Sequence, residues 1–356
     1  MRNVIQALQK CLFLSLFIIV VKTSQAQNTP VQLKIKDFAV WGGSVSPSSY
    51  NSSQGVFIGN IVAIEGNVGS SQLVNAKNLF SITGNIYSGN IVSLGNLGKV
   101  TGNIFAAKTA PNSPVNVIEG DYKVNFTGNL TANGKIVLKS LGGNNATSVT
   151  GQVAVPAPSS TNYSGPAPSG GITNTLSLPL LPTMPTSNAF DNQAGTTNIT
   201  GTQTISPGKF KKLALTGSKV LTFNGPGNYI FSEVDNDLTS NKLVFDFKNT
   251  TTGSINIFII GNAKWGRLTV STVNGNFTDR IYTEIHGTGT GNDGNAFDIV
   301  GASVMPANNY VWLGNVWAPN GGISFKSINP FNTPHVLGAL WSAKKVELDQ
   351  EYKIGL

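Results

Sequence analysis

Three acidic side chains alternate in the second half of the chain and are the first candidates for chemistry. On a β-strand, Glu233, Asp235 and Asp237 would share one face, with neighbours about 6.5–7 Å apart. That spacing fits the carboxylate pair of an inverting glycosidase, or the oxygen ligands of a calcium ion. Asn236-Asp237 followed by Ser240 is equally typical of a turn. These residues are therefore candidates for a calcium site, and a solvated acidic edge is the alternative.

Two further segments could bind ions or substrates. Glu347, Asp349 and Glu351 alternate in the last strand expected from the sequence. Charges on a terminal coil protect an exposed sheet edge, so we expect that role for them. The glycine-rich run 287–298 lacks the Lys-Ser/Thr of a phosphate-binding loop and the Asp spacing of an EF-hand. We expect a turn there.

The two histidines carry little catalytic signal. His286 and His335 lie 49 residues apart, and no serine nucleophile motif accompanies them. The one cysteine, Cys11, lies in the N-terminal apolar run, so a thiolate metal site in the exported chain is excluded. We expect no catalytic residues and no cofactor.

Ice binding is a further hypothesis, because it requires a flat face with a regular ladder of threonines. Thr200, Thr202 and Thr204 form one row, and Thr288 with Thr290 forms a second. These two rows do not recur at the spacing of a solenoid coil.

The elements that must position such residues are short strands separated by a recurring phrase, Gly-Asn followed by an aliphatic residue. The fuller form, Thr-Gly-Asn-aliphatic, begins at Thr83, Thr101 and Thr127, with a degenerate copy at Thr150. The starts are 18, 26 and 23 residues apart, which is about one coil of a solenoid. Gly and Asn tolerate positive φ, so we expect each pair to turn the chain before a strand. The pattern predicts an all-β, right-handed parallel β-helix.

The first 26 residues are typical of a secretory signal peptide. Arg2 and Lys10 precede an apolar run, and Ser24-Gln25-Ala26 is a small-x-small cleavage signal. The run is too short to span a bilayer, and no later stretch is long enough for a transmembrane segment. We therefore expect a secreted, extracellular or cell-surface protein without disulfides.

Charge is scarce along the chain. Lysine and arginine exceed aspartate and glutamate by a formal +8, and charged residues make up 11% of the chain. The basic residues are scattered and do not form the stripe that nucleic acid requires, so we expect no nucleic-acid partner. A surface made polar by amides and hydroxyls suits contact with sugars or with other surfaces.

Composition divides the remaining chain into three parts. The Gly-Asn repeats occupy 27–155, and a second β-rich region occupies 194–356. Between them, 156–193 is rich in Pro, Ser and Gly, which favours an extended connector. Its leucines favour a strap packed along the solenoid over a disordered linker. The two β-rich regions form either one stack or two.

Two tryptophans near the end repeat at coil spacing. Trp317 and Trp341 are 24 residues apart and follow the aliphatic residues Val316 and Leu340. Because side chains alternate along a strand, we expect the aliphatic pair in the core and the tryptophans on the outer face. There they would dock the strap or form a recognition strip for a surface or a sugar. We favour docking, because an uncovered pair of tryptophans is costly.

The C-terminal motifs resemble those of the choice-of-anchor A type domains. The segments that carry the resemblance run from Gly314 to Ile323 and from Val336 to Val346, and Gly227 to Phe231 fits the same pattern. The resemblance implies a β-helical module of bacterial exported and cell-surface proteins, some of them labelled collagen-binding or adhesin-like. It carries no catalytic motif. No sorting domain or wall anchor is visible before Leu356, so we expect either a released protein or one part of a longer one.

Together these patterns predict a non-enzymatic structural or adhesive module of a cell surface or extracellular matrix. The expected partners are an extracellular glycan, a matrix protein or another surface component. The alternatives are a polysaccharide-acting β-helix enzyme, either a lyase or a glycoside hydrolase, and an ice-binding protein.

Overall fold

The computed structural model describes residues 31–44, 49–110, 112–143, 146–275, 278–289, 294–301, 310–326 and 335–356. Residues 32–356 form one compact unit. The expected signal peptide at 1–26 lies outside the described residues. Within the described ranges, no helix has the length and apolar character that a membrane crossing requires.

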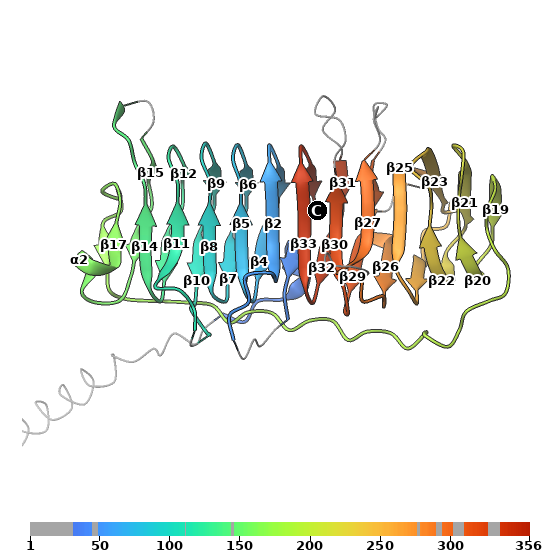
Figure 1. Cartoon of the computed structure of the whole chain (residues 1–356), viewed down its shortest axis with the longest axis horizontal. Helices are drawn as coiled ribbons and strands as arrows, with labels where there is room; N and C mark the ends of the chain where they lie inside the picture. The colour runs from blue at the N-terminus through green and yellow to red at the C-terminus, as the bar shows by residue number, and fades with distance from the viewer. Residues whose placement is uncertain are drawn as a thin grey trace, which may run out of the picture. The chain divides into compact units, whose positions relative to one another are not determined.

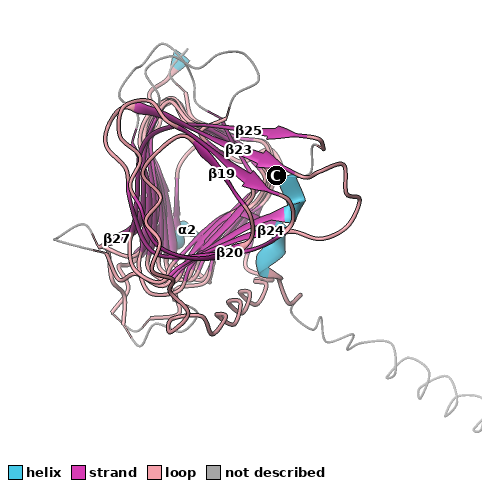
Figure 2. Ribbon diagram, turned by 90° about the vertical axis from the view of Figure 1, so that its right-hand side faces the viewer, coloured by secondary structure: helices cyan, strands magenta, loops and turns pink. Residues whose placement is uncertain are grey.

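The unit is a parallel β-helix whose coils have three sides, as Figure 2 shows along the stack. Two sides belong to a 26-stranded sheet, and an 8-stranded sheet forms the third. Neighbouring strands in each side pair in parallel, as β1 does with β4 and β3 with β6. The predicted all-β, parallel β-helical fold is therefore confirmed. We call the three sides the first, second and third ladder.

In spatial order, the first ladder consists of β18 (Ile172–Thr173), β16 (Val153–Ala154), β13 (Leu130–Ala132), β10 (Ile104–Ala106), β7 (Ile86–Ser88), β4 (Asn67–Ser70), β1 (Phe38–Gly42), β32 (Leu340–Ser342), β29 (Asn315–Ala318), β26 (Ile281–Ile285), β24 (Ile255–Ile259), β22 (Gly227–Asp235) and β20 (Gly208–Leu213).

The second ladder consists of β17 (Tyr163–Ser164), β14 (Lys135–Leu138), β11 (Asn116–Gly120), β8 (Ile91–Leu94), β5 (Leu73–Ala76), β2 (Gly55–Asn60), β33 (Lys345–Gln350), β30 (Gly322–Lys326), β27 (Asn295–Gly301), β25 (Ala263–Val273), β23 (Ser240–Asp246), β21 (Val220–Asn224) and β19 (Gln203–Ile205).

The third ladder consists of β15 (Ser148–Val149), β12 (Asn125–Phe126), β9 (Lys99–Thr101), β6 (Ser81–Thr83), β3 (Ala63–Glu65), β34 (Lys353–Gly355), β31 (His335–Leu337) and β28 (Trp312–Leu313). The short helices are η1 (Ile35–Asp37), α2 (Ser159–Asn162) and η3 (Thr278–Arg280).

The two β-rich regions form one stack, and they meet in its middle (Figure 1). On the first ladder β1 pairs with β32, on the second β2 pairs with β33, and on the third β3 pairs with β34. The N-terminal coils then continue to β17 and β18, and the C-terminal coils begin at β19 and β20. The outermost strands of the stack therefore come from the middle of the sequence.

The strap, residues 174–198, links the two ends of the stack. The sequence places the start of the connector at 156, but β17 and β18 still belong to the last N-terminal coil. From there the strap runs below the strands in Figure 1. The Leu33 amide donates to the Leu180 carbonyl oxygen at 3.1 Å, and further along the Lys211 amide donates to the Thr197 carbonyl oxygen at 2.8 Å. The strap is thus ordered along the first ladder.

The core is formed by the inward side chains of the three ladders. Val40, Leu340 and Val316 are opposite one another on adjacent strands and fully buried. Alternation of buried and outward side chains, with aliphatic residues inside, is the reason these short segments form strands. Stacking like residues on successive coils keeps the register fixed.

The Gly-Asn repeats stabilise the corners between strands. The side-chain oxygen of Asn67 accepts from the amide of Asn85 at 2.9 Å, and that of Asn85 accepts from the amide of Asn103 at 2.8 Å. Gly84 has a φ of +152°, and a Cβ there would lie 2.3 Å from the Gly66 carbonyl oxygen. Glycine is therefore required at that corner.

A second corner departs from the expected pattern. In Gly59-Asn60-Ile61 the residue with positive φ is Ile61, at 59°, and Leu97 follows Asn96 with a φ of 60°. The expectation that Gly and Asn supply the positive φ is wrong for these copies. The side-chain oxygen of Asn60 accepts from the amide of Asn78 at 3.0 Å, which ties the corner to the next coil.

Candidate functional site

The acidic candidates in and after β22 are engaged in structural contacts. Lys212 Nζ, on β20, lies 3.0 Å from Glu233 Oε1 and 2.8 Å from Asp235 Oδ2. Both carboxylates are half-exposed on the outer side of the first ladder, close to its end. They form a small surface ion-pair cluster with one lysine.

Asp237 is separate from that pair, because β22 ends at Asp235. Its carboxylate accepts from the amide of Thr239 at 3.0 Å and from the amide of Gly217 at 3.2 Å, and Thr239 Oγ1 is a further donor. The hydrogen bond from Thr239 Oγ1 lowers the pKa of Asp237 below its ordinary value, and the amide donors add to the effect. Glu233 and Asp235 share the outer face of β22, whereas Asp237 lies in the turn that was the alternative expected from the sequence. Among the described residues, no three His, Cys, Asp or Glu side chains are grouped to hold a metal ion.

The C-terminal acidic residues do not protect an edge. β33, which carries Glu347 and Asp349, pairs with β30 on one side and with β2 on the other. The expectation of a terminal coil is wrong here, because the C-terminal coil stacks on the first N-terminal coil. Glu347 is held by Lys345 Nζ at 3.0 Å and by Asn295 Nδ2 at 3.1 Å.

Trp317 and Trp341 are opposite each other on β29 and β32, in the expected register. Trp41 on β1 continues this tryptophan row, because it pairs with Trp341. The three indoles belong to a cluster separate from the core, with exposed fractions of 2% for Trp317, 8% for Trp341 and 0% for Trp41. The sequence-based prediction did not include Trp41, which lies at the other end of the described chain, although Val40-Trp41 has the same aliphatic-Trp pattern.

Side chains of the strap cover the tryptophan row. Leu181 and Met184 pack against this cluster, as do Leu33 and Ile35 from the segment before β1. Trp341 Nε1 donates to the Phe38 carbonyl oxygen at 2.9 Å. The structure thus places the two predicted tryptophans on the outer side of the first ladder, under the strap.

A buried carboxylate anchors the strap beside this row. Glu284 on β26 is 0% exposed and lies next to Trp317 in register. Its Oε1 accepts from the Asn188 amide at 2.7 Å, and its Oε2 accepts from Asn188 Nδ2 at 2.6 Å and from Tyr282 Oη at 2.8 Å. Burial, together with the charge of Glu284, raises the pKa of Tyr282, which keeps this hydroxyl a donor.

His286 extends the anchor. Its Nε2 lies 2.7 Å from Glu284 Oε1, and its Nδ1 lies 2.6 Å from Asp191 Oδ1 on the strap. Phe190 stacks on the imidazole, with ring centroids 4.1 Å apart. From the sequence, the two-residue spacing of Glu284 and His286 could have predicted that their side chains share one face of a strand. Nothing in the sequence pointed to Asn188 and Asp191.

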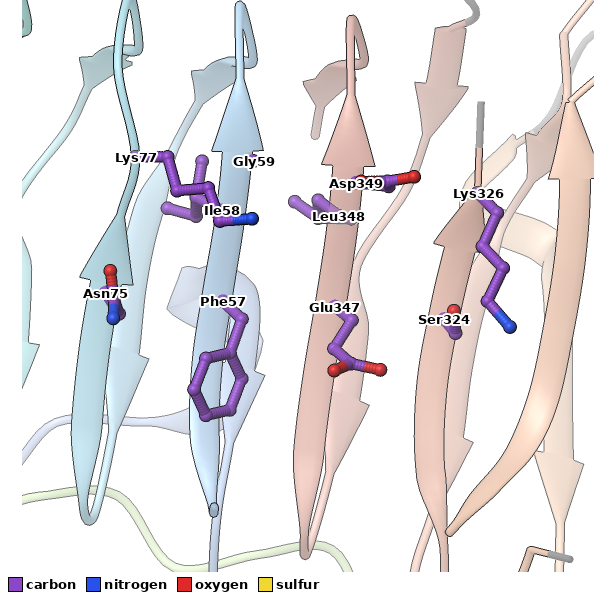
Figure 3. A pocket seen from close by; sticks show the side chains of 10 residues that line it. All are labelled: Phe57, Ile58, Gly59, Asn75, Lys77, Ser324, Lys326, Glu347, Leu348 and Asp349. Carbon is purple, nitrogen blue, oxygen red and sulfur yellow. The ribbon is translucent and has the colours of Figure 1, made fainter. Parts of the chain in front are cut away.

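The second ladder carries a groove where the two β-rich regions meet. This junction groove has a volume of about 340 Å³. Figure 3 shows the side chains that line it, which come from β2, β5, β30 and β33 and the residues next to them. They are Phe57, Ile58, Gly59, Asn75, Lys77, Ser324, Lys326, Glu347, Leu348 and Asp349.

The third ladder presents a row of exposed hydroxyls. Thr83 pairs with Thr101 in register, and the amide of Thr127 donates to the carbonyl oxygen of Val100 at 3.0 Å. The amide of Thr150 continues the pattern by donating to the carbonyl oxygen of Phe126 at 2.9 Å. All four threonines are exposed, and we call them the threonine row. The residues two positions earlier on each strand are Ser81, Lys99, Asn125 and Ser148.

The threonine rows expected from the sequence do not form such an array. Thr204 on β19 pairs with Thr222, but the next residue in that row is Val244. Thr200 and Thr202 precede β19, Thr288 follows β26, and Thr290 lies outside the described residues. The regular row was instead carried by the Thr-Gly-Asn phrases.

No protein-family model matches the chain, and no curated protein matches it. Among solved structures, the chain is similar to an ice binding protein from an Antarctic bacterium, Flavobacteriaceae, at 12% sequence identity. The match covers 90% of this chain and 97% of that chain, with a TM-score of 0.27. At that TM-score the likeness carries no argument about function, and the fold is assigned from the strand register of this chain.

Proposed function

We propose that the chain is an exported, non-enzymatic module with a structural or adhesive role at a cell surface or in an extracellular matrix. The observation that carries the proposal is the third ladder. Along β6, β9, β12 and β15 its outward residues are hydroxyls and amides with one lysine, Lys99, and they lie in register on consecutive strands. Their inward neighbours, such as Ile82, Val100 and Phe126, are fully buried, which holds the face rigid.

A rigid, repeating polar face favours contact with an extended partner. Its threonine row offers a hydroxyl group on each of four consecutive coils, about 4.8 Å apart. Because the side chains are held by the sheet, little conformational entropy is lost on binding. The partners that fit are an extracellular glycan, a matrix protein or another surface component. The resemblance to choice-of-anchor A type domains supports the same role.

The non-enzymatic part of the proposal rests on the structural contacts that the acidic candidates make. Glu233 and Asp235 share Lys212, and Asp237 closes a turn. A glycosidase needs two carboxyl groups that face each other across a substrate site. Degradation of a panel of polysaccharides by the full chain, abolished by Asp235→Ala or Asp237→Ala, would show an enzyme and overturn this part.

Adhesion is tested by binding of the full chain to glycan and matrix-protein arrays. We expect binding that weakens when Thr101, at the centre of the threonine row, is replaced by tyrosine. Thr204→Tyr is the matched control, because Thr204 is an exposed threonine on β19, at the end of the second ladder and away from the junction. Unchanged array binding by Thr101→Tyr would show that the third ladder is not the binding face. Absence of binding by the parent chain would overturn the proposal.

Ice binding is a second candidate function, and the threonine row favours it. Four exposed threonines on consecutive coils form the kind of regular hydroxyl ladder that the function requires. The first test is thermal hysteresis and inhibition of ice recrystallisation by the full chain. Activity that Thr101→Tyr abolishes and Thr204→Tyr preserves would establish it, and its absence from the parent chain would exclude it.

A further inference from the structure

A glycine on β2 forms part of the floor of the junction groove. A Cβ on Gly59 would lie 1.1 Å from the Asp349 carbonyl oxygen, so no other residue fits the close approach of β2 and β33. The two strands lie side by side beneath the lining side chains (Figure 3). The backbone fixes the floor of the groove, and a ligand would find it already formed.

An aromatic ring lines the junction groove. Phe57 is half-buried on the outer side of the second ladder, and its neighbours in the row are polar. Asn75 is in register with it on β5, and Glu347 is in register with it on β33. A half-exposed phenyl ring between an amide and a carboxylate offers an apolar platform with hydrogen-bonding groups on both sides.

The polar groups around the ring carry both signs of charge. Lys77 and Lys326 lie with Glu347 and Asp349 along the groove. Two ammonium groups and two carboxylates give no net field for a polyanion or a polycation. Glu347 is also held in place by Lys345 and Asn295, at 3.0 and 3.1 Å, so its acceptor oxygens are positioned before a ligand arrives.

We propose that the junction groove binds a neutral glycan chain, with a sugar ring stacked on Phe57. The amide of Asn75, the ammonium group of Lys77 and the carboxylates of Glu347 and Asp349 are hydrogen-bond partners for its hydroxyl groups. The groove volume of about 340 Å³ is in the range of small-ligand sites and is enough for a short stretch of the glycan. This inference rests on the proposed function, and it names the ligand class for a second face of the same module.

The test is isothermal titration calorimetry of the full chain with cello-, chito- and manno-oligosaccharides. We expect at least one of them to bind, and Phe57→Ala to weaken its affinity about tenfold or more, as expected for loss of a stacking anchor. Phe57→Leu keeps apolar volume in the row, removes the aromatic platform, and should weaken binding similarly. Tyr122→Ala is the control, because Tyr122 is also an exposed aromatic residue and lies outside the groove.

The outcomes separate this inference from the proposed function. If the chain binds glycans or matrix proteins on arrays but the Phe57 variants bind oligosaccharides as the parent does, the groove assignment is wrong and the adhesive role stands. If no oligosaccharide in the panel binds to the parent chain, the groove assignment is also overturned. Failure of the parent on both the arrays and the panel would overturn both. Circular dichroism of each variant establishes that it is folded.

Discussion

The indole nitrogen of Trp341 donates a hydrogen bond of 2.9 Å to the carbonyl oxygen of Phe38, 303 positions earlier in the chain. This contact joins the last C-terminal coil to the first N-terminal coil. The ring of Phe38 also contacts that of Trp41, with centroids 4.9 Å apart in an edge-to-face arrangement. The junction is therefore closed by aromatic packing on its outer side and by aliphatic stacking inside.

Replacing Trp317 tests whether the tryptophan row is structural. Trp317→Ala should lower the free energy of unfolding by about 3–5 kcal/mol, as for a buried aromatic truncation. Urea denaturation measures the change, and Tyr122→Ala, which truncates an exposed aromatic residue, should cost far less. A variant that unfolds like the parent but no longer binds a surface or glycan would show that the row is a recognition strip.

The junction should not tolerate a side chain at Gly59. Gly59→Ala forces β2 away from β33, and we expect a loss of about 1–3 kcal/mol or more, the cost of overpacking. Gly201→Ala is the matched control, since a Cβ there meets nothing within 4 Å. Chemical denaturation of the two variants gives the comparison. Equal stabilities would mean that the close approach at Asp349 is not rigid.

The strap should loosen when its buried anchor is changed. Glu284→Gln replaces one acceptor oxygen with an amide donor that faces the donors of Asn188, at a cost of about 1–3 kcal/mol for an unsatisfied buried group. Hydrogen exchange should then accelerate in residues 186–193 and remain slow in the third ladder. Glu233→Gln, which removes only a surface ion pair, should leave the exchange of the strap unchanged. Unaltered exchange of the strap in Glu284→Gln would contradict the anchor.

Acidification should abolish the contribution of Asp237 to the stability of the folded chain. Its pKa is lowered in the folded chain, mainly by Thr239 Oγ1. Its stabilising effect is therefore complete above the ordinary aspartate pKa, about 4, and is lost as the pH falls through the folded value. Asp237→Asn should be less stable than the parent at neutral pH, and the difference in the free energy of unfolding should shrink as the pH falls below the ordinary aspartate pKa. Thr239→Val removes the same donor and should act in the same direction, whereas a difference independent of pH would rule out this origin.

The sequence was most informative where one coil repeats the next. The 24-residue interval between Trp317 and Trp341 predicted their register, because parallel stacking requires like positions to meet. The threonine row was also present in the sequence, where the Thr-Gly-Asn phrases at intervals of 18, 26 and 23 residues indicated turns and coil length but were not interpreted as a row of exposed hydroxyls. The described extra residues lie in corners such as 107–110 with 112–115, and 139–143 with 146–147, where they lengthen a coil without shifting its strands.

Contacts between distant segments had no comparable signal. The one local signal is that Ala39-Val40-Trp41 repeats Ala339-Leu340-Trp341. A single short match 300 positions away was not used in the prediction, so β33 was mistaken for a terminal strand. The contacts of Asn188 and Asp191 with Glu284 and His286 depend on the path of the strap, which composition describes only as extended. The close approach of Gly59 to Asp349 and the junction groove follow from the pairing of β2 with β33 and could not be inferred without it.

The strap links the length of the stack to the length of a connector. A new coil added beyond β17 or β19 would move that end of the stack by about 4.8 Å, and the strap would need one or two more residues to reach it. Coils can therefore be gained or lost only together with matching changes in 174–198. Relatives of this chain with other coil numbers should keep the junction unchanged. They should differ at both ends of the stack and in the length of the strap, which must match the length of the stack.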